Sequence, residues 1–186
     1  MPPRTALVPI AHGSEEMEAV TIIDTLRRAD VDVTVASVAP TRQVTCSRGV
    51  QLIADTLLTE WPAQPVDLIV LPGGMPGAAH LRDSALLTTL LLAHQERDAL
   101  LGAICAAPAV VLRPHGLIAD RRVTSHPAFF DQLDPAQRSE DRVVHDGNLL
   151  TSRGPGTALE FALALVEALA GPAVRHEVAG PMLVLE

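Results

Sequence analysis

The chain has 186 residues, of which 48% are hydrophobic and 2% are aromatic, and its formal net charge is -8. This size and hydrophobicity predict a single domain, residues 1–186, whose core needs no disulfides or structural metal. The few aromatic residues, the negative charge and the lack of basic runs argue against a nucleic-acid-binding surface and against a polybasic membrane patch.

The alternation of strand-like and helical segments indicates an α/β fold in which helices cover a mostly parallel sheet. The first two strands are expected over residues 5–10 and 31–38, which are rich in aliphatic side chains. Between them, apolar residues recur on one helical face over about residues 15–29, and Ser14 is the natural N-cap.

The middle of the chain contains two further pairs of a strand and a helix. Residues 66–71 form an apolar run that ends at Pro72-Gly73-Gly74, which indicates a buried strand stopping at a tight loop. A helix is expected after it, over about residues 84–97. Residues 100–104 form another short apolar run, followed by a turn and a helical stretch over residues 107–115.

The C-terminal part is predicted to contain a hairpin and a buried helix. An Asp-Gly pair separates residues 142–144 from residues 149–151, so these segments should pair antiparallel at the edge of the sheet. Thr157 and Glu160 form a T-x-x-E capping box before residues 161–169, which are apolar nearly all round and are therefore expected to be buried.

Cys105 is the first candidate for chemistry. It lies where a buried strand turns into a helix, and small neighbours permit a sharp elbow. A thiol at a helix N-terminus favours the thiolate, and the N–H of Ala106, with one from the Gly73-Gly74 loop, would stabilise an oxyanion. The alternative is a buried cysteine that only packs in the core.

Three carboxylates begin the first predicted helix, namely Glu15, Glu16 and Glu18. Their attraction to the helix dipole explains all three without any chemistry. Glu15 and Glu18 both border the core-facing stripe, so helix geometry does not choose between them. A buried carboxyl beside a thiol would have a raised pKa and would act as a proton donor.

His126 follows a short apolar segment and could lie at a strand end near the same sheet edge. It is a candidate general acid or base, and the alternative is an ordinary surface histidine. The sequence has no lysine, which excludes a Schiff-base lysine and a lysine-containing phosphate loop. Neither cysteine belongs to a metal-ligand pattern, so we expect no metal and no cofactor.

The chain is also expected to be cytoplasmic. Its beginning shows no secretory signal, and no apolar run approaches the length of a membrane span. Cys46 and Cys105 fit a reducing compartment as free thiols.

Several motifs follow one another along the chain, ending with His176-Glu177-Val178-Ala179. The others are Gly13-Ser14-Glu15-Glu16-Met17-Glu18, Thr45-Cys46-Ser47-Arg48-Gly49-Val50, Leu71-Pro72-Gly73-Gly74, Ala103-Ile104-Cys105-Ala106-Ala107-Pro108 and Thr151-Ser152-Arg153-Gly154-Pro155-Gly156-Thr157. Together they resemble the ThiJ/PfpI superfamily, most closely its DJ-1/YajL branch.

This resemblance implies a flavodoxin-like three-layer sandwich, usually a homodimer, with a reactive cysteine at a strained elbow. It assigns that cysteine to Cys105 and the protonated glutamate bonded to it to Glu18. The other positions that it assigns are the amide donors Gly74 and Ala106, the nearby histidine His126, the dimer-proximal Arg48, and the pocket-bordering Gly73, Ser152 and Arg153.

Two departures from the pattern restrict the chemistry. The protease-like branch has a histidine directly after the cysteine, whereas this chain has Ala106, so a Cys-His hydrolase dyad of that kind is missing. Cys46 matches a peripheral cysteine of the family. A third cysteine of some members corresponds to Ile53 here, which excludes an intersubunit disulfide at that site.

The resemblance implies a glutathione-independent glyoxalase III or protein deglycase, acting on methylglyoxal, related 2-oxoaldehydes or glycated protein adducts in carbonyl and oxidative stress defence. The alternative is a redox sensor or oxidative-stress chaperone that functions through oxidation of Cys105 to sulfinate. Loss of activity on oxidation would indicate the enzyme, and gain of function on oxidation would indicate the sensor.

Overall fold

Residues 3–184, which the computed structural model describes, alternate between strands and helices. The strands are β1 (Thr5–Ile10), β2 (Asp32–Ser37), β3 (Gln43–Thr45), β4 (Gln51–Ile53), β5 (Thr56–Leu57), β6 (Leu68–Leu71), β7 (Leu100–Ile104), β8 (Val143–Asp146) and β9 (Leu149–Ser152). The α-helices are α1 (Glu16–Arg28), α2 (Gly77–Asp83), α3 (Ala85–Glu96), α4 (Ala158–Ala170) and α5 (Pro172–Ala179). The predicted domain, residues 1–186, extends past this range at both ends.

A seven-stranded sheet has the order β5-β2-β1-β6-β7-β9-β8. Its neighbouring strands are parallel except for β8 and β9, which pair antiparallel. The short strands β3 and β4 form a separate antiparallel hairpin. The fold is therefore the expected flavodoxin-like α/β sandwich, whose strand order reverses between β1 and β6.

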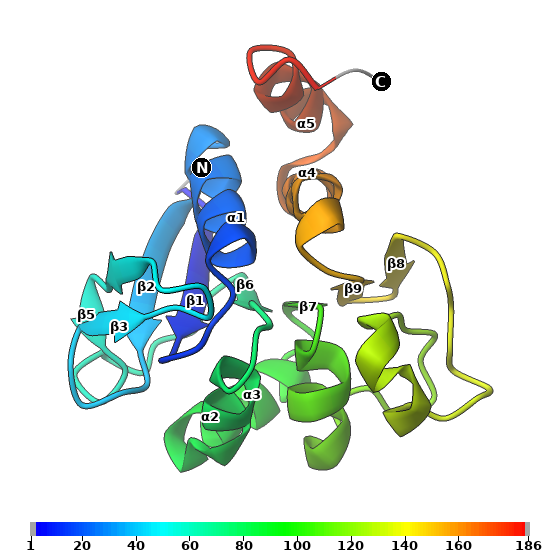
Figure 1. Ribbon diagram of the computed structural model, residues 1–186. Helices are drawn as coiled ribbons and strands as arrows, with labels where there is room; N and C mark the ends of the chain where they lie inside the picture. Colours follow the sequence, from blue (N-terminus) through cyan, green and yellow to red (C-terminus); the bar gives the residue numbers. More distant parts are fainter. Residues whose placement is uncertain (1–2, 185–186) are drawn as a thin grey trace.

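Helices cover both faces of the sheet (Figure 1). Helices α1, α4 and α5 lie on one side, and α2 and α3 lie on the other. Helix α1 buries Ala19, Ile22 and Leu26, which share one face, whereas α4 buries seven of its side chains, including Phe161. The strands β1, β6 and β7 are buried on both faces, as near-continuous apolar runs require.

Most predicted strands and helices are confirmed within two residues of their bounds. The predicted antiparallel hairpin pairs Val143 with Ser152, and β8 lies at the sheet edge. The stretch 107–115 differs from a regular helix, because a π-helical turn over Pro108–Leu112 is followed by a 3-10 turn over Arg113–His115. Pro114 has no N–H to donate, which breaks the helical ladder there.

One predicted helix cap is wrong, and the other is right in position but not in its bonds. Glu15, not Ser14, is the N-cap of α1, and its carboxylate accepts a hydrogen bond from the Glu18 N–H at 2.7 Å. The Ser14 hydroxyl instead accepts from the Ala11 N–H at 3.0 Å. Thr157 is the N-cap of α4, but its side chain makes no capping bond.

Among residues 3–184, no helix has the length and hydrophobicity needed to cross a lipid bilayer.

Candidate active site

Cys105 directly follows β7 and adopts a backbone conformation that is unusual for a residue with a side chain. Its φ is 63°, in the left-handed region. Three hydrogen bonds fix it there: the Cys105 carbonyl accepts from the Ser125 hydroxyl at 2.7 Å and from the His126 N–H at 2.8 Å, and the Cys105 N–H donates to the Ser152 carbonyl at 3.0 Å. The surrounding fold thus holds the strained elbow predicted from the sequence.

Glu18 is fully buried and reaches the thiol from α1. Its Oε2 accepts a hydrogen bond from the Gly73 N–H at 2.8 Å. Its Oε1 is buried without a nitrogen or oxygen partner among the described residues, and the carboxyl group is hydrogen-bonded to the Cys105 side chain. The alternative that helix geometry left open is therefore resolved, because Glu15 caps the helix instead.

Glu16, in the same first turn of α1, has a structural role. Its carboxylate accepts hydrogen bonds from the Ser47 hydroxyl at 2.9 Å and from the Arg48 N–H at 2.8 Å. These bonds lower the pKa of Glu16, against the effect of burial. They also hold the loop that carries Arg48 beside the start of α1.

Burial raises the pKa of Glu18 to about 7, as expected for a carboxyl that donates a proton. Burial, and then the negative charge of Glu18, raise the pKa of Cys105 to about 12, although the N–H groups of Gly74 and Ala106 lower it. Burial and the charge of Glu18 thus act against the thiolate that the helix terminus was expected to favour, while the two N–H groups act for it. The thiol is buried, and the turn that follows it is a π-helical turn of only five residues.

The two groups consequently titrate as a pair. When Glu18 is protonated, its repulsive charge is absent and its O–H donates to sulfur. The carboxyl and the thiol can then share one proton, with the amides of Gly74 and Ala106 directed at the sulfur. This arrangement suits proton transfer to and from a sulfur nucleophile.

Two glycines after β6 allow this close approach. A Cβ on Gly73 would lie 2.6 Å from the Cys105 Cβ and 2.8 Å from the Ala106 nitrogen. Gly74 has a φ of +84°, and a Cβ there would lie 2.4 Å from the Glu15 nitrogen. A side chain at Gly73 would collide with Cys105 and Ala106, and one at Gly74 would collide with Glu15. The tight loop predicted after β6 therefore needs glycine at both positions.

A cavity of about 550 Å³ opens beside the sulfur. His126 lines it, but the residue does not lie at a strand end, because it precedes a 3-10 helix over Pro127–Gln132 and its Nδ1 accepts from the Ala128 N–H. The full lining comprises Glu15, Met17, Ser47, Arg48, Gly74, Met75, Cys105, Ala106, His126, Phe129 and Pro155. The structure therefore brings Cys105, Gly74, Ala106, His126 and Arg48 to one cavity.

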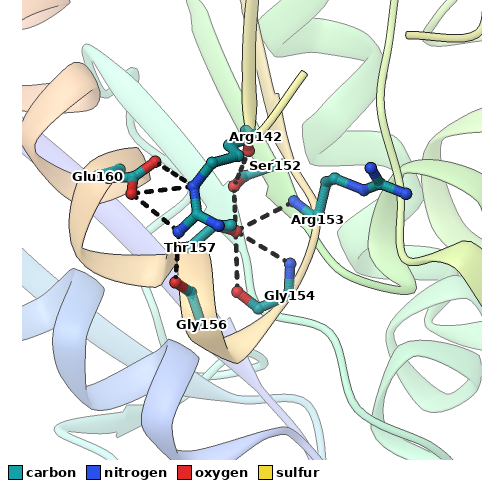
Figure 2. Close-up of polar contacts among 7 residues, drawn as sticks. All are labelled: Arg142, Ser152, Arg153, Gly154, Gly156, Thr157 and Glu160. Atoms are coloured by element: carbon teal, nitrogen blue, oxygen red, sulfur yellow. Dashed lines mark hydrogen bonds and ion pairs between the residues drawn. The ribbon is translucent and has the colours of Figure 1, made fainter. Parts of the chain in front are cut away.

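Ser152 and Arg153 have different places. Ser152 is buried, and its hydroxyl donates to the Arg142 carbonyl and contacts the Thr157 hydroxyl, both at 2.7 Å (Figure 2). It supports the elbow through its carbonyl and does not line the Cys105 cavity. Arg153 lines a neighbouring cavity that shares His126 and Pro155 with the first.

The hydrogen bonds of Thr157 explain why the predicted capping box does not form. Its Oγ1 accepts from the Arg153 and Gly154 N–H groups at 3.3 and 3.1 Å, so it is directed into the preceding loop (Figure 2). Glu160, the other member of the box, instead forms an ion pair with Arg142 at 2.8 Å.

Sequence reasoning missed Ser125 and Arg142. Ser125 is fully buried and directly precedes His126, yet a serine in a loop has no pattern that predicts a bond to a carbonyl 20 residues away.

Within the described part of the chain, no group of three or more His, Cys, Asp or Glu side chains could hold a metal ion. Cys46 is buried, and burial raises its pKa to about 11.

Comparison with known proteins gives consistent results. A model of the DJ-1/PfpI family matches residues 4–168. Protein DJ-1 homolog B of Arabidopsis thaliana is 52% identical over 89% of this chain, which spans only 38% of that relative. The glutathione-independent glyoxalase DJR-1.2 of Caenorhabditis elegans is 36% identical, over 91% of this chain and 90% of the relative.

A solved structure of oxidised Toxoplasma gondii DJ-1 superposes with a TM-score of 0.97. It is 46% identical, and the match covers 98% of this chain and 100% of that one. The resemblance carried by the sequence motifs is thereby confirmed over nearly their whole extent. The chain belongs to the DJ-1/PfpI family.

Proposed function

We propose that the protein is a cysteine-dependent, cofactor-independent glyoxalase that converts methylglyoxal and related 2-oxoaldehydes to 2-hydroxy acids. The observation that carries the proposal is the hydrogen-bonded pair of Cys105 and Glu18, with two amides directed at the sulfur beside a cavity. The name of the C. elegans relative, a glutathione-independent glyoxalase, supports it. Glycated protein adducts are proposed as further substrates.

The reaction begins when the Cys105 sulfur adds to the aldehyde carbon while Glu18 accepts the thiol proton. The carbonyl electron pair moves to oxygen, where the N–H groups of Gly74 and Ala106 stabilise the negative charge. Glu18 returns the thiol proton to that oxygen and then, with His126, moves a proton from the former aldehyde carbon to the neighbouring carbon through an enediol. The aldehyde carbon is oxidised to a thioester and the ketone is reduced to an alcohol.

Water then hydrolyses the thioester and restores the thiol. The sum is methylglyoxal plus water giving lactate, so no external oxidant or reductant is needed. An internal redox reaction of this kind requires only a nucleophile, an oxyanion site and a group that accepts and returns protons.

We expect Cys105→Ser to lower lactate formation from methylglyoxal, without glutathione, by at least about 1,000-fold, because an alcohol of ordinary pKa replaces the nucleophilic sulfur. Lactate would be quantified over many turnovers at matched protein concentration. Cys46→Ser, which changes the other buried thiol, should retain the wild-type rate. Equal rates in wild type and Cys105→Ser would contradict the mechanism, as would no turnover above buffer.

A redox sensor is the second candidate, because the T. gondii neighbour was solved in an oxidised form. Amides and a protonated carboxyl around the Cys105 sulfur would stabilise a sulfinate as they would an oxyanion. Peroxide treatment followed by mass spectrometry separates the candidates. Sulfinate formation that abolishes lactate production supports the enzyme, whereas oxidation that elicits suppression of client aggregation by an inactive protein supports the sensor.

We further propose a homodimer that forms through α1 and β4. Met17, Val20 and Ile53 are 60%, 46% and 72% exposed; Val20 and Ile53 line one groove, and Met17 lies one helical turn before Val20. Large exposed apolar side chains gathered on one face favour association.

We expect Ile53→Arg to shift the mass measured by light scattering from two chains to one. Leu183→Arg, at an 85% exposed position elsewhere, should remain dimeric.

A further inference from the structure

A second cavity, of about 340 Å³, lies next to the one at Cys105. It is lined by His126, Pro127, Arg142, Arg153, Gly154, Pro155, Gly156 and Thr157. Among the residues 3–184 that line it, two arginines and a histidine are ionisable and none is a carboxylate. In a chain whose net charge is -8, this gathering of cationic side chains favours an anion.

The cavity adjoins the Cys105 cavity, because His126 and Pro155 line both. An extended small molecule that passes His126 and Pro155 would have one end near the sulfur and the other end near Arg153. The arrangement indicates a substrate with two different ends, one reactive and one charged.

Arg153 carries the positive charge of this second cavity that no ion pair compensates among residues 3–184. Its guanidinium lies 5.7 Å from the centre of the Phe130 ring, and its Nη1 donates to the Glu140 carbonyl at 2.9 Å. It forms no ion pair with a carboxylate within the range 3–184. Stacking and a single carbonyl bond orient the group but leave its positive charge available to a ligand.

Arg142 has a different role. Its guanidinium binds both oxygens of Glu160 and the Gly156 carbonyl, which fixes it at the wall of the cavity and compensates its charge (Figure 2). The N-terminus of the 13-residue helix α4 lies at the same wall, and Thr157 makes no side-chain capping bond there. Because Glu160 already lies in the first turn of this helix, Arg153 remains the main attraction for an anion.

We propose that this second cavity binds the carboxylate of an acidic 2-oxoaldehyde, with Arg153 as the main specificity-determining residue. The inference rests on the proposed glyoxalase function and names its preferred class of substrate. A suitable probe is 4,5-dioxovalerate, in which a two-carbon spacer separates the 2-oxoaldehyde from a carboxylate. Its aldehyde carbon is oxidised and its ketone reduced, so addition of water gives 2-hydroxyglutarate without any other reactant.

The test compares kcat/KM for 4,5-dioxovalerate with kcat/KM for methylglyoxal, which has no charged end. Arg153→Gln should lower this ratio by about tenfold, because a charge-assisted bond to the carboxylate is lost. Arg138→Gln is the matched control: Arg138 also lies 5.7 Å from the Phe130 ring but pairs with Asp131 and does not line the cavity. The control should keep the wild-type ratio.

A binding measurement separates failure of this inference from failure of the proposed function. Glutarate, an unreactive dicarboxylate, would be titrated into wild type and Arg153→Gln, with chemical shifts or calorimetry as the readout and uncharged glutaramide as the control. Weaker glutarate binding in the variant without any turnover in wild type would retain the anion site and reject the glyoxalase. Methylglyoxal turnover with an unchanged substrate ratio in Arg153→Gln would overturn the anion site.

Discussion

Replacement of Glu18 by Gln should lower kcat for methylglyoxal by about 100-fold or more. The amide oxygen still accepts the bond that the Gly73 N–H now donates to Oε2, so the loop after β6 keeps its position. An amide cannot, however, accept the thiol proton or move a proton between the two carbons. The measurement is lactate formation under saturating methylglyoxal, and a rate within twofold of wild type would show that Glu18 transfers no proton.

The same variant tests the pKa of Glu18 through stability. The pKa is raised from 4.5 to about 7 in the folded protein. The neutral carboxyl therefore stabilises the fold fully below pH 4.5, and this contribution is lost as pH rises through about 7. Urea unfolding of wild type should show the free energy of unfolding decreasing from pH 5 to 8, whereas Glu18→Gln should lack this component.

Glu16→Gln is the control for that slope. Glu16 lies in the same helical turn, but its pKa is lowered, so the carboxylate stays charged throughout the range from pH 5 to 8. Its replacement should leave the slope in place. The same slope in wild type and in Glu18→Gln would mean that Glu18 is already ionised in the folded protein over this range.

Gly73→Ala is the second change with a large expected effect. The new methyl would lie 2.6 Å from the Cys105 Cβ and 2.8 Å from the Ala106 nitrogen, so the elbow has to move. We expect a loss of stability of about 1–3 kcal/mol from this overpacking, together with loss of most activity, because the sulfur leaves its place beside Glu18 and the amides. Urea unfolding and lactate formation measure the two effects.

Gly180→Ala provides the comparison. Gly180 has a φ of -57°, and a Cβ there meets only ordinary contact, at 3.5 Å from the His176 carbonyl oxygen. Its activity should equal that of wild type. Retention of wild-type activity by Gly73→Ala would show that the elbow tolerates displacement and that the position of the sulfur does not control the reaction.

The alternation of apolar runs with helical patterns was sufficient to predict a mostly parallel sheet covered by helices and the bounds of its longer strands, because a buried parallel strand needs a continuous apolar segment. The hairpin β3–β4 and the two-residue strand β5 were missed. Strands of two or three residues are too short to show a period. Ser14 as a cap and the capping bonds of Thr157 were wrong for a related reason, since both side chains bond to neighbouring loops instead of to their own helices, although Thr157 is the N-cap of α4.

At the candidate site, the sequence by itself determined which residue types stand after β1, β6 and β7: carboxylates, a glycine pair and a cysteine at an elbow. Helix geometry alone did not choose between Glu15 and Glu18, which border the same face; the motif resemblance assigned Glu18, and the tertiary structure shows why, since Glu15 caps the helix while Glu18 meets Cys105. The tertiary structure also sets the direction in which the pKa values of Glu18 and Cys105 shift. Burial depends on the packing of distant segments, and it outweighs the helix terminus that local sequence suggested.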